Sequence, residues 1–314
     1  MRHESLVLKK GQIITAEHIA ALQAANISEI TVAQLAPGDI GEDEAARRLA
    51  AKLAGDNLRC DRAFTGRVNL FAERAGLAVV DADAIVGVNA VSEEITAATL
   101  APFSAVAPGD MVATVKIIPF AVSGALLEQS LIAAGQGGVR VAPFRPLRIG
   151  VVSTILPGLK SSVVNKTVRI LSERLALAAA TIVDETRVPH DVDALAGALK
   201  TLAPKCDVAI IFGASAITDR RDVIPAAIEA IGGRIEHFGM PVDPGNLLLL
   251  GSLGAKPIIG APGCARSPKE NGFDWVLRRI LADVPISGAD IRAMGVGGLL
   301  MEIVTRPQPR LGES

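Results

Sequence analysis

The chain has 314 residues, of which 50% are hydrophobic and 3% aromatic, and its 32 basic and 33 acidic residues leave a net charge of −1. This length predicts two domains, or three. The balanced charge and the lack of tyrosine argue against a nucleic-acid-binding surface. No uncharged run is long enough to span a membrane, and the N-terminus MRHESLVLKKG does not resemble a signal peptide. We therefore expect a cytoplasmic protein with no membrane or nucleic-acid partner.

The N-terminal region, residues 1–145, mixes helical and β-rich patterns. Gly11–Leu22 is typical of a turn followed by a helix, and Glu42–Leu53 of an alanine-rich helix. Short β-rich pieces are expected at Val68–Phe71, Leu77–Val80 and Met111–Ile118. These patterns predict one or two small α+β modules.

A domain boundary is predicted near Pro143–Pro146, because two prolines interrupt the chain there. Beyond it, apolar strands alternate with helices that carry apolar residues at helical spacing. The expected strands are Leu147–Val152, Ala180–Val183, Val208–Phe212, Leu247–Leu250 and Pro257–Ile259. This order predicts an α/β domain with a largely parallel sheet over residues 146–284. The tail, residues 285–314, is expected to be flexible.

The segment Asp207–Ala227, with the sequence DVAIIFGASAITDRRDVIPAA, carries the strongest functional signal. A buried strand leads into a loop of small residues, Gly213–Ala216, and a helix with an early proline follows. Small side chains let a ligand approach the backbone, and free N–H groups there favour an anion. The nearby acidic residues could hold a cation that bridges to a phosphate. An ordinary strand-to-helix turn is the alternative.

Other candidate residues lie near the ends of the same strands, where ligands bind to open α/β sheets. Ser153 and Thr154 follow the first strand. Arg221 can pair with a phosphate, or remain a solvated surface charge. Asp222 and Asp191 each hold a position typical of a helix N-cap, so a capping role stands beside a catalytic one. His190 is either a group that transfers protons or a histidine of a surface loop.

These segments resemble the molybdopterin-binding domain shared by molybdopterin adenylyltransferases and molybdenumtransferases, over about residues 146–283. Gly213–Ala227 is similar to the family's glycine-rich loop with its following Arg-Asp pair and early proline. Val188–Leu195, VPHDVDAL, is similar to a Val-Pro-Asp-Asp-x-x-Ala-Leu segment, and Asn165 matches an Asn near a helix start.

The resemblance extends to Asp243-Pro244-Gly245 and Ala261-Pro262-Gly263-Cys264, which are similar to the Pro-Gly pairs of molybdenumtransferases. The chain also departs from the family pattern. Ala214 stands where the family carries the second Gly of a Gly-Gly pair, and Ala216 or Ile217 replaces a later Gly of the loop. His190 replaces the first Asp of the Val-Pro-Asp-Asp segment. The acidic set that the family uses for catalysis is therefore incomplete.

The resemblance implies a three-layer domain that binds molybdopterin during molybdenum cofactor biosynthesis or delivery. Nucleotidyl or molybdate transfer to molybdopterin is the candidate reaction, with Asp222 and Asp191 as catalytic acids and Mg²⁺ at Asp222. The residues implied to bind the ligand are Gly213, Ala214, Ser215, Ala216, Arg221, Ser153, Thr154, Asn165, Gly245, Pro262 and Gly263.

Two alternatives stay open beside this interpretation. One is a Mg²⁺-dependent nucleotide hydrolase or amidase related to competence-damage proteins. The other is a non-catalytic carrier or partner module. The resemblance also implies self-association into a homo-oligomer and contact with molybdoenzymes during their maturation.

Overall fold

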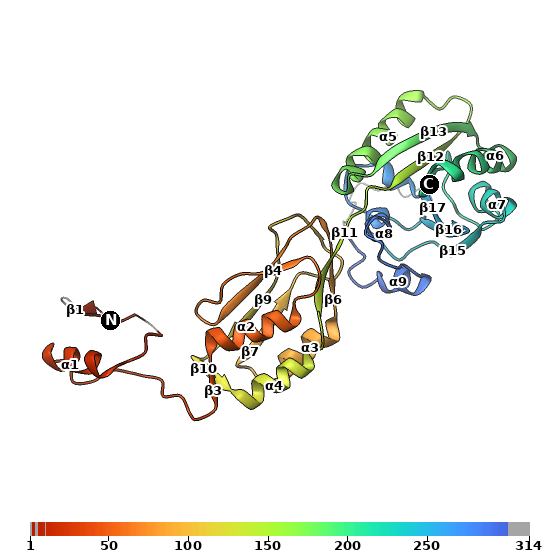
Figure 1. Ribbon diagram of the computed structural model, residues 1–314. Coiled ribbons are helices and arrows are strands. Elements are labelled where there is room, and N and C mark those ends of the chain that lie inside the picture. Colours follow the sequence, from red (N-terminus) through yellow and green to blue (C-terminus); the bar gives the residue numbers. More distant parts are fainter. Residues whose placement is uncertain (1, 4–5, 10, 301–314) are drawn as a thin grey trace, which may run out of the picture. The chain divides into compact units, whose positions relative to one another are not determined.

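The computed structural model describes residues 2–3, 6–9 and 11–300 of the chain (Figure 1). By their internal contacts the residues divide into two units, Met1–Val141 and Ala142–Ser314. Within the described residues, no helix combines the length and the apolar character needed to cross a membrane.

The first unit is built from short helices and small antiparallel sheets. Its helices are α1 (Ala16–Ala24), α2 (Glu42–Leu53), α3 (Ala82–Val91) and α4 (Gly124–Ala133). The strands up to the unit boundary are β1 (Arg2–His3), β2 (Leu6–Val7), β3 (Asp39–Gly41), β4 (Leu58–Cys60), β5 (Arg67–Ala72), β6 (Gly76–Val80), β7 (Ile95–Thr99), β8 (Ala105–Val106), β9 (Met111–Ile117), β10 (Ala121–Ser123) and β11 (Val139–Pro143). The sheets have the orders β4-β5-β9-β7, β11-β6-β8, β10-β3 and β1-β2.

Helix α2 shows why this unit folds as it does. Ala45, Leu49 and Leu53 recur at intervals of four residues and are all buried, so one face of the helix is apolar. That face joins the buried side of β5, where Val68 and Leu70 alternate with more exposed residues. The expected α+β character of the N-terminal region is confirmed.

The second unit contains one six-stranded sheet between two layers of helices. Its strands are β12 (Arg148–Ile155), β13 (Thr181–Pro189), β14 (Val208–Phe212), β15 (Arg234–Phe238), β16 (Leu249–Leu253) and β17 (Lys256–Ala261). Its helices are α5 (Ser161–Leu175), α6 (Val192–Leu202), α7 (Val223–Ala230), α8 (Gly272–Leu281) and α9 (Gly288–Ala293), with 3-10 helices η1 (Ala176–Ala178), η2 (Ala203–Lys205) and η3 (Gly263–Arg266).

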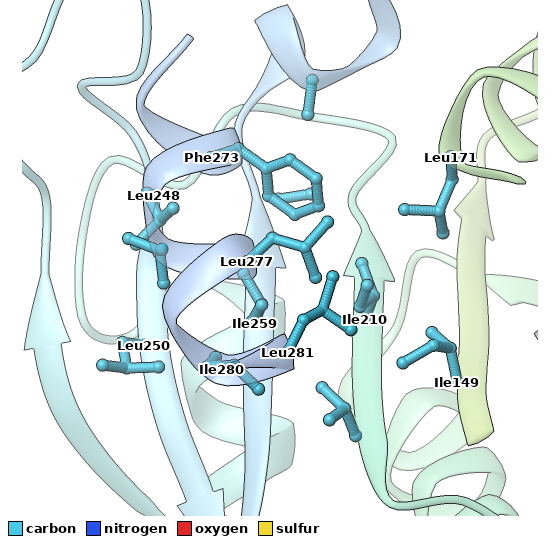
Figure 2. Packing of buried hydrophobic residues seen from close by; sticks show 14 of the residues in the cluster. Ile149, Leu171, Ile210, Leu248, Leu250, Ile259, Phe273, Leu277, Ile280 and Leu281 are labelled. Atoms are coloured by element: carbon cyan, nitrogen blue, oxygen red, sulfur yellow. The ribbon is translucent and has the colours of Figure 1, made fainter. Parts of the chain in front are cut away.

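The sheet order is β13-β12-β14-β17-β16-β15, in which β13, β12, β14 and β17 are parallel and β16 is antiparallel to both of its neighbours. One face packs against α5, α8 and α9, as Figure 2 shows for Phe273 and Leu277 above Ile210 and Ile259. The other face packs against α6 and α7. The predicted three-layer α/β domain with a largely parallel sheet is confirmed.

The alternation of side chains along β12 determines which face of the sheet each of its polar residues occupies. Ile149 and Val151 face the layer of α5 and α8, whereas Val152 faces α6. Because successive side chains of a strand point to opposite faces, Ser153 continues the first face and Thr154 the second. The C-terminal end of this strand therefore presents one hydroxyl group on each side of the sheet.

The expected flexible tail is wrong for residues 288–300. Gly288–Ala293 form α9, whose Ile291 is fully buried in the core of the second unit. The Asp243 N–H donates to Gly298 O at 2.8 Å, and Leu299 forms a parallel bridge with Asp243. Gly295–Gly298 thus belongs to an ordered turn, while residues 301–314 lie outside the described part of the chain.

Candidate functional site

The candidate residues converge at one edge of the sheet because four parallel strands end there. In the ladder, Ser153 of β12 pairs with Phe212 of β14, and Phe212 pairs with Ala261 of β17. On the other side of β12, Thr154 pairs with Val188 of β13. The loops that begin at 156, 190, 213 and 262 therefore leave the sheet side by side.

The small-residue loop after β14 turns tightly at Gly213. A Cβ atom at this position would lie 2.8 Å from the backbone oxygen of Ser215 and 2.9 Å from Cδ1 of Ile224. Ile217 closes the same turn from its far end, because its side chain is 3% exposed and packs over Gly260 of β17. The loop is consequently held at both ends by the sheet.

Between these two anchors the loop offers hydrogen-bond donors. Within the described residues, nothing accepts from the backbone N–H groups of Ser215, Ala216 and Ile217. Ser215 and Ala216 are exposed. Successive free N–H groups in a turn form a binding place for anions, so the loop has the chemistry of a phosphate cradle.

Two side chains from neighbouring strand ends, Thr154 and His190, stand behind this cradle. The Ala214 N–H donates to Thr154 Oγ1 at 2.8 Å. The same oxygen lies 2.8 Å from His190 Nδ1, and the other ring nitrogen of His190, Nε2, lies 2.9 Å from Ser215 Oγ. Of the residues predicted from the sequence, Thr154 thus contacts Ala214 directly and is linked to Ser215 through His190.

Arg266, which was not predicted, is a cationic group that contacts the first residue of the cradle. Its guanidinium donates to Gly213 O at 2.7 Å and lies 5.7 Å from the centre of the Phe212 ring. It is half-buried, and this burial lowers the pKa of the guanidinium, which still stays protonated at neutral pH. No carboxylate among the described residues forms an ion pair with it. Arg266 is the last residue of η3, which begins at Gly263, but only the fold places it over β14.

Ser153 presents a second unusual polar group. It is 3% exposed, and within the described residues its Oγ has no hydrogen-bond partner. Buried hydroxyl groups normally have one, and an exception calls for an explanation such as a ligand or an ordered water. Ser153 lies on the same face of the sheet as Phe212, the ring that Arg266 covers.

Asp222 does not cap α7 as the sequence suggests. It occupies the N-cap position, but its side chain makes no bond to the helix. Instead, Oδ2 accepts hydrogen bonds from the Thr218 and Asp219 N–H groups at 2.6 and 2.9 Å, and from Thr218 Oγ1 at 3.2 Å. These bonds hold the pKa of Asp222 below its ordinary value, and the bond from the Thr218 N–H has the largest effect. The carboxylate therefore closes the loop 218–222.

Asp191 and Arg221 also have partners of their own. Asp191 caps α6 by accepting from the N–H groups of Asp193 and Ala194, both at 3.0 Å. Arg221 pairs with Asp219 at 3.0 Å, with its side chain 90% exposed. The contacts of Asp191 are those of a helix N-cap, and the contacts of Arg221 are those of a surface charge.

The remaining predicted residues are less directly tied to the cradle. Asn165 accepts from Arg187 at 2.6 Å. Gly245 is buried, and a Cβ atom there would lie 2.9 Å from the backbone of Gly272, so this glycine serves the packing of the start of α8. Pro262 precedes η3, and Gly263 is exposed. Within the described residues no group of three or more His, Cys, Asp or Glu side chains could hold a metal ion.

We expect Gly213→Ala to weaken the binding of a phosphate ligand at least tenfold, because the new methyl group would push the Ser215 carbonyl and misplace the donors that follow. Removing charge-assisted hydrogen bonds has effects of about this size. Gly197→Ala, in α6 of the same unit, is the control, since a Cβ atom there meets nothing within 4 Å. Isothermal titration calorimetry measures both. Equal affinities of the two variants would contradict the steric argument.

Several solved structures resemble this chain at low sequence identity. The CinA protein of unknown function from Thermoplasma acidophilum is 16% identical, with 44% of this chain and 98% of that chain covered and a TM-score of 0.34. The molybdopterin biosynthesis enzyme MoaB from Thermus thermophilus gives the same four values. The molybdopterin biosynthesis protein MoeA from Pyrococcus horikoshii is 14% identical, with 80% of each chain covered and a TM-score of 0.31.

No curated protein matches the sequence. One protein family does, and the part of the chain that it matches contains β12, β14, β17, the loop 213–222 and Arg266. The resemblance inferred from the sequence is confirmed for this segment: residues 149–283 match the family described as the probable molybdopterin binding domain.

Proposed function

We propose that the second unit binds molybdopterin, through its phosphate group, as part of the biosynthesis or delivery of the molybdenum cofactor. Two observations carry the proposal. Among the described residues, the half-buried Arg266 forms no ion pair with a carboxylate, and three backbone N–H groups of the neighbouring loop have no acceptor. All of these groups lie within the segment that matches the molybdopterin-binding family. Within the described residues these groups lack an anionic partner, and a phosphate would supply one.

The same strand ends supply surface for the rest of such a ligand. Leu156 and Leu159, in the loop after β12, are 47% and 39% exposed. The Oγ of Ser153 on the neighbouring face needs a hydrogen-bond partner. A pterin offers an apolar ring face together with polar ring edges, and ligand sites typically combine apolar walls with a few polar groups. Apolar, hydroxyl and cationic groups of this kind therefore fit a phosphorylated pterin.

The contacts of the two candidate acids favour a carrier over a transferase. Asp222 and Asp191 both use a carboxylate oxygen to hold local backbone. Asp222 still has Oδ1 to offer, and Mg²⁺ is commonly held by one carboxylate together with substrate phosphates. Nucleotidyl or molybdate transfer assisted by Mg²⁺ at Asp222 is therefore the second candidate function.

The binding test is calorimetry of the full chain with molybdopterin under anaerobic conditions, with and without Mg²⁺. We expect saturable binding that Arg266→Met weakens and that Arg148→Met leaves unchanged, since Arg148 pairs with Asp207 at the opposite end of β12. If the wild-type chain binds neither molybdopterin nor its adenylylated or molybdate-loaded form, the proposal is wrong.

The reaction is tested separately by incubating the complex with ATP and Mg²⁺, or with molybdate, and analysing the products. A carrier gives no product. A transferase gives product, and Asp222→Ala then removes turnover but retains binding. A nucleotide hydrolase would instead consume pyrophosphate-containing nucleotides in the absence of molybdopterin.

A further inference from the structure

We propose that His190 is a positioning residue that aims the Ser215 hydroxyl proton at the ligand, so that the cradle presents hydrogen-bond donors and selects a fully ionised phosphate group. The inference rests on the proposed function in one respect, which is that the whole ligand is molybdopterin. Its subject is the phosphate group, which inorganic phosphate can represent in an experiment.

The backbone fixes His190 between two strands. Its N–H donates to Ile155 O at the end of β12, at 3.0 Å. Its ring then contacts Thr154 Oγ1 through Nδ1 and Ser215 Oγ through Nε2, at 2.8 and 2.9 Å. Both ring nitrogens therefore have partners, and the ring orientation is set from both sides.

The direction of the hydrogen bonds follows from the burial of Thr154, which is 1% exposed. Its oxygen already accepts from the Ala214 N–H. Within the described residues, the acceptor in reach of its hydroxyl proton is His190 Nδ1. Thr154 must donate to Nδ1, because the opposite direction would leave a buried donor without an acceptor. A neutral imidazole with a bare Nδ1 carries its proton on Nε2.

This assignment fixes what Ser215 can do. Its Oγ accepts the proton of His190 Nε2, so its own hydroxyl proton is left for a ligand. The N–H groups of Ser215, Ala216 and Ile217 and the guanidinium of Arg266 are donors as well. All of these groups are donors, so an ionised phosphate oxygen matches them, whereas a protonated phosphate oxygen would bring a competing donor. The arrangement consequently favours a phosphate dianion.

The same contacts argue against a nucleophilic serine. A base at His190 would need a bare Nε2, and hence a proton on Nδ1 that turns the buried Thr154 hydroxyl away from its acceptor. The third member that stabilises an imidazolium in Ser-His hydrolases is a carboxylate. Among the described residues no carboxylate forms a hydrogen bond or ion pair with His190. The geometry therefore supports a His190 that orients the Ser215 hydroxyl group and does not activate it as a nucleophile.

The first test is the tautomer of His190 in the ligand-free, ¹⁵N-labelled full chain. The chain has four histidines, so the His190→Gln spectrum assigns the His190 signals by difference. Long-range ¹H–¹⁵N correlation at pH 8 should show the proton on Nε2. A proton on Nδ1 would overturn the proposal, whether or not the protein binds molybdopterin.

The second test is calorimetry with inorganic phosphate. We expect Ser215→Ala and His190→Asn each to weaken binding about tenfold, since each removes one hydrogen bond to a charged ligand or its support. His190→Gln should stay within about threefold of the wild type, because its amide N–H can replace Nε2–H, although glutamine cannot act as a base. The double variant Ser215→Ala/His190→Asn should bind no more weakly than Ser215→Ala, which would show that His190 acts through Ser215.

Thermal melts of all variants check that the fold is kept, and the Gln and Asn variants differ by a single methylene group. Additive losses in the double variant, or equal losses in the Gln and Asn variants, would contradict the proposal, as would a wild-type chain that does not bind phosphate. Phosphate binding with the expected tautomer but without molybdopterin binding would instead contradict only the proposed function.

Discussion

Replacing Arg174 with alanine is expected to lower the free energy of unfolding of the second unit by about 3–5 kcal/mol, the range for breaking one half of a buried ion pair. Arg174 and Asp274 are 9% and 6% exposed, and Arg174 Nε donates to Asp274 Oδ1 at 2.6 Å. The same guanidinium donates to the carbonyl oxygens of Ala265 and Ser267 at 2.9 and 2.6 Å. Alanine would leave a buried carboxylate and two carbonyl groups without this partner.

Urea unfolding followed by Trp275 fluorescence measures this effect, because Trp275 is the single tryptophan and lies in α8 of the second unit. Arg169→Ala is the matched control. Arg169 lies in the same helix and pairs with Glu173 at the surface, with both side chains more than half exposed. Such pairs contribute about 0.3–0.5 kcal/mol. Similar losses in the two variants would show that burial of the Arg174 pair does not matter.

Replacing Arg266 with methionine is expected to weaken molybdopterin or phosphate binding about 10- to 100-fold, as the loss of hydrogen bonds to a charged group would do. Stability should not fall with it. Burial of the guanidinium already lowers the pKa of Arg266, and no carboxylate among the described residues pairs with it, so the charge is a cost in the ligand-free protein. Methionine keeps most of the apolar length that packs over Phe212.

The measurement combines calorimetry with a thermal melt of the ligand-free chain. A variant that binds as well as the wild type would remove Arg266 from the site. A variant that melts far below the wild type would mean that the guanidinium serves the fold. Arg148→Met controls for the loss of a positive charge elsewhere in the same unit.

The elements predicted well from the sequence are those whose pattern is local. β14 and α2 have the predicted bounds, because a run of buried apolar residues and a four-residue apolar spacing are complete signals by themselves. β13 is longer than predicted and β15 was missed. Both are edge strands of the sheet, where charged residues such as Asp184, Glu185 and Glu236 interrupt the apolar pattern.

The site was predictable in its small-residue loop and much less so in its side-chain contacts. Gly213, Ser215 and Thr154 are recognisable in sequence from strand ends and small residues. The link through His190 depends on the register of β12 with β13, and the role of Arg266 depends on η3 lying over β14. Asp222 has the sequence position of an N-cap, but two N–H groups on its N-terminal side compete for its carboxylate and hold it.

The buried side chain of Ile217 divides the loop after β14 into two mechanically separate parts. Gly213–Ala216 is fixed by the close contact at Gly213 and by the bond from Ala214 to Thr154. Residues 218–222 are closed by hydrogen bonds to Asp222 and Asp219 within the segment, at the surface. Changes of length are therefore far better tolerated after Ile217 than before it. Insertions or substitutions at residues 219–221 could therefore create contacts to a further group of the ligand while the cradle keeps its shape.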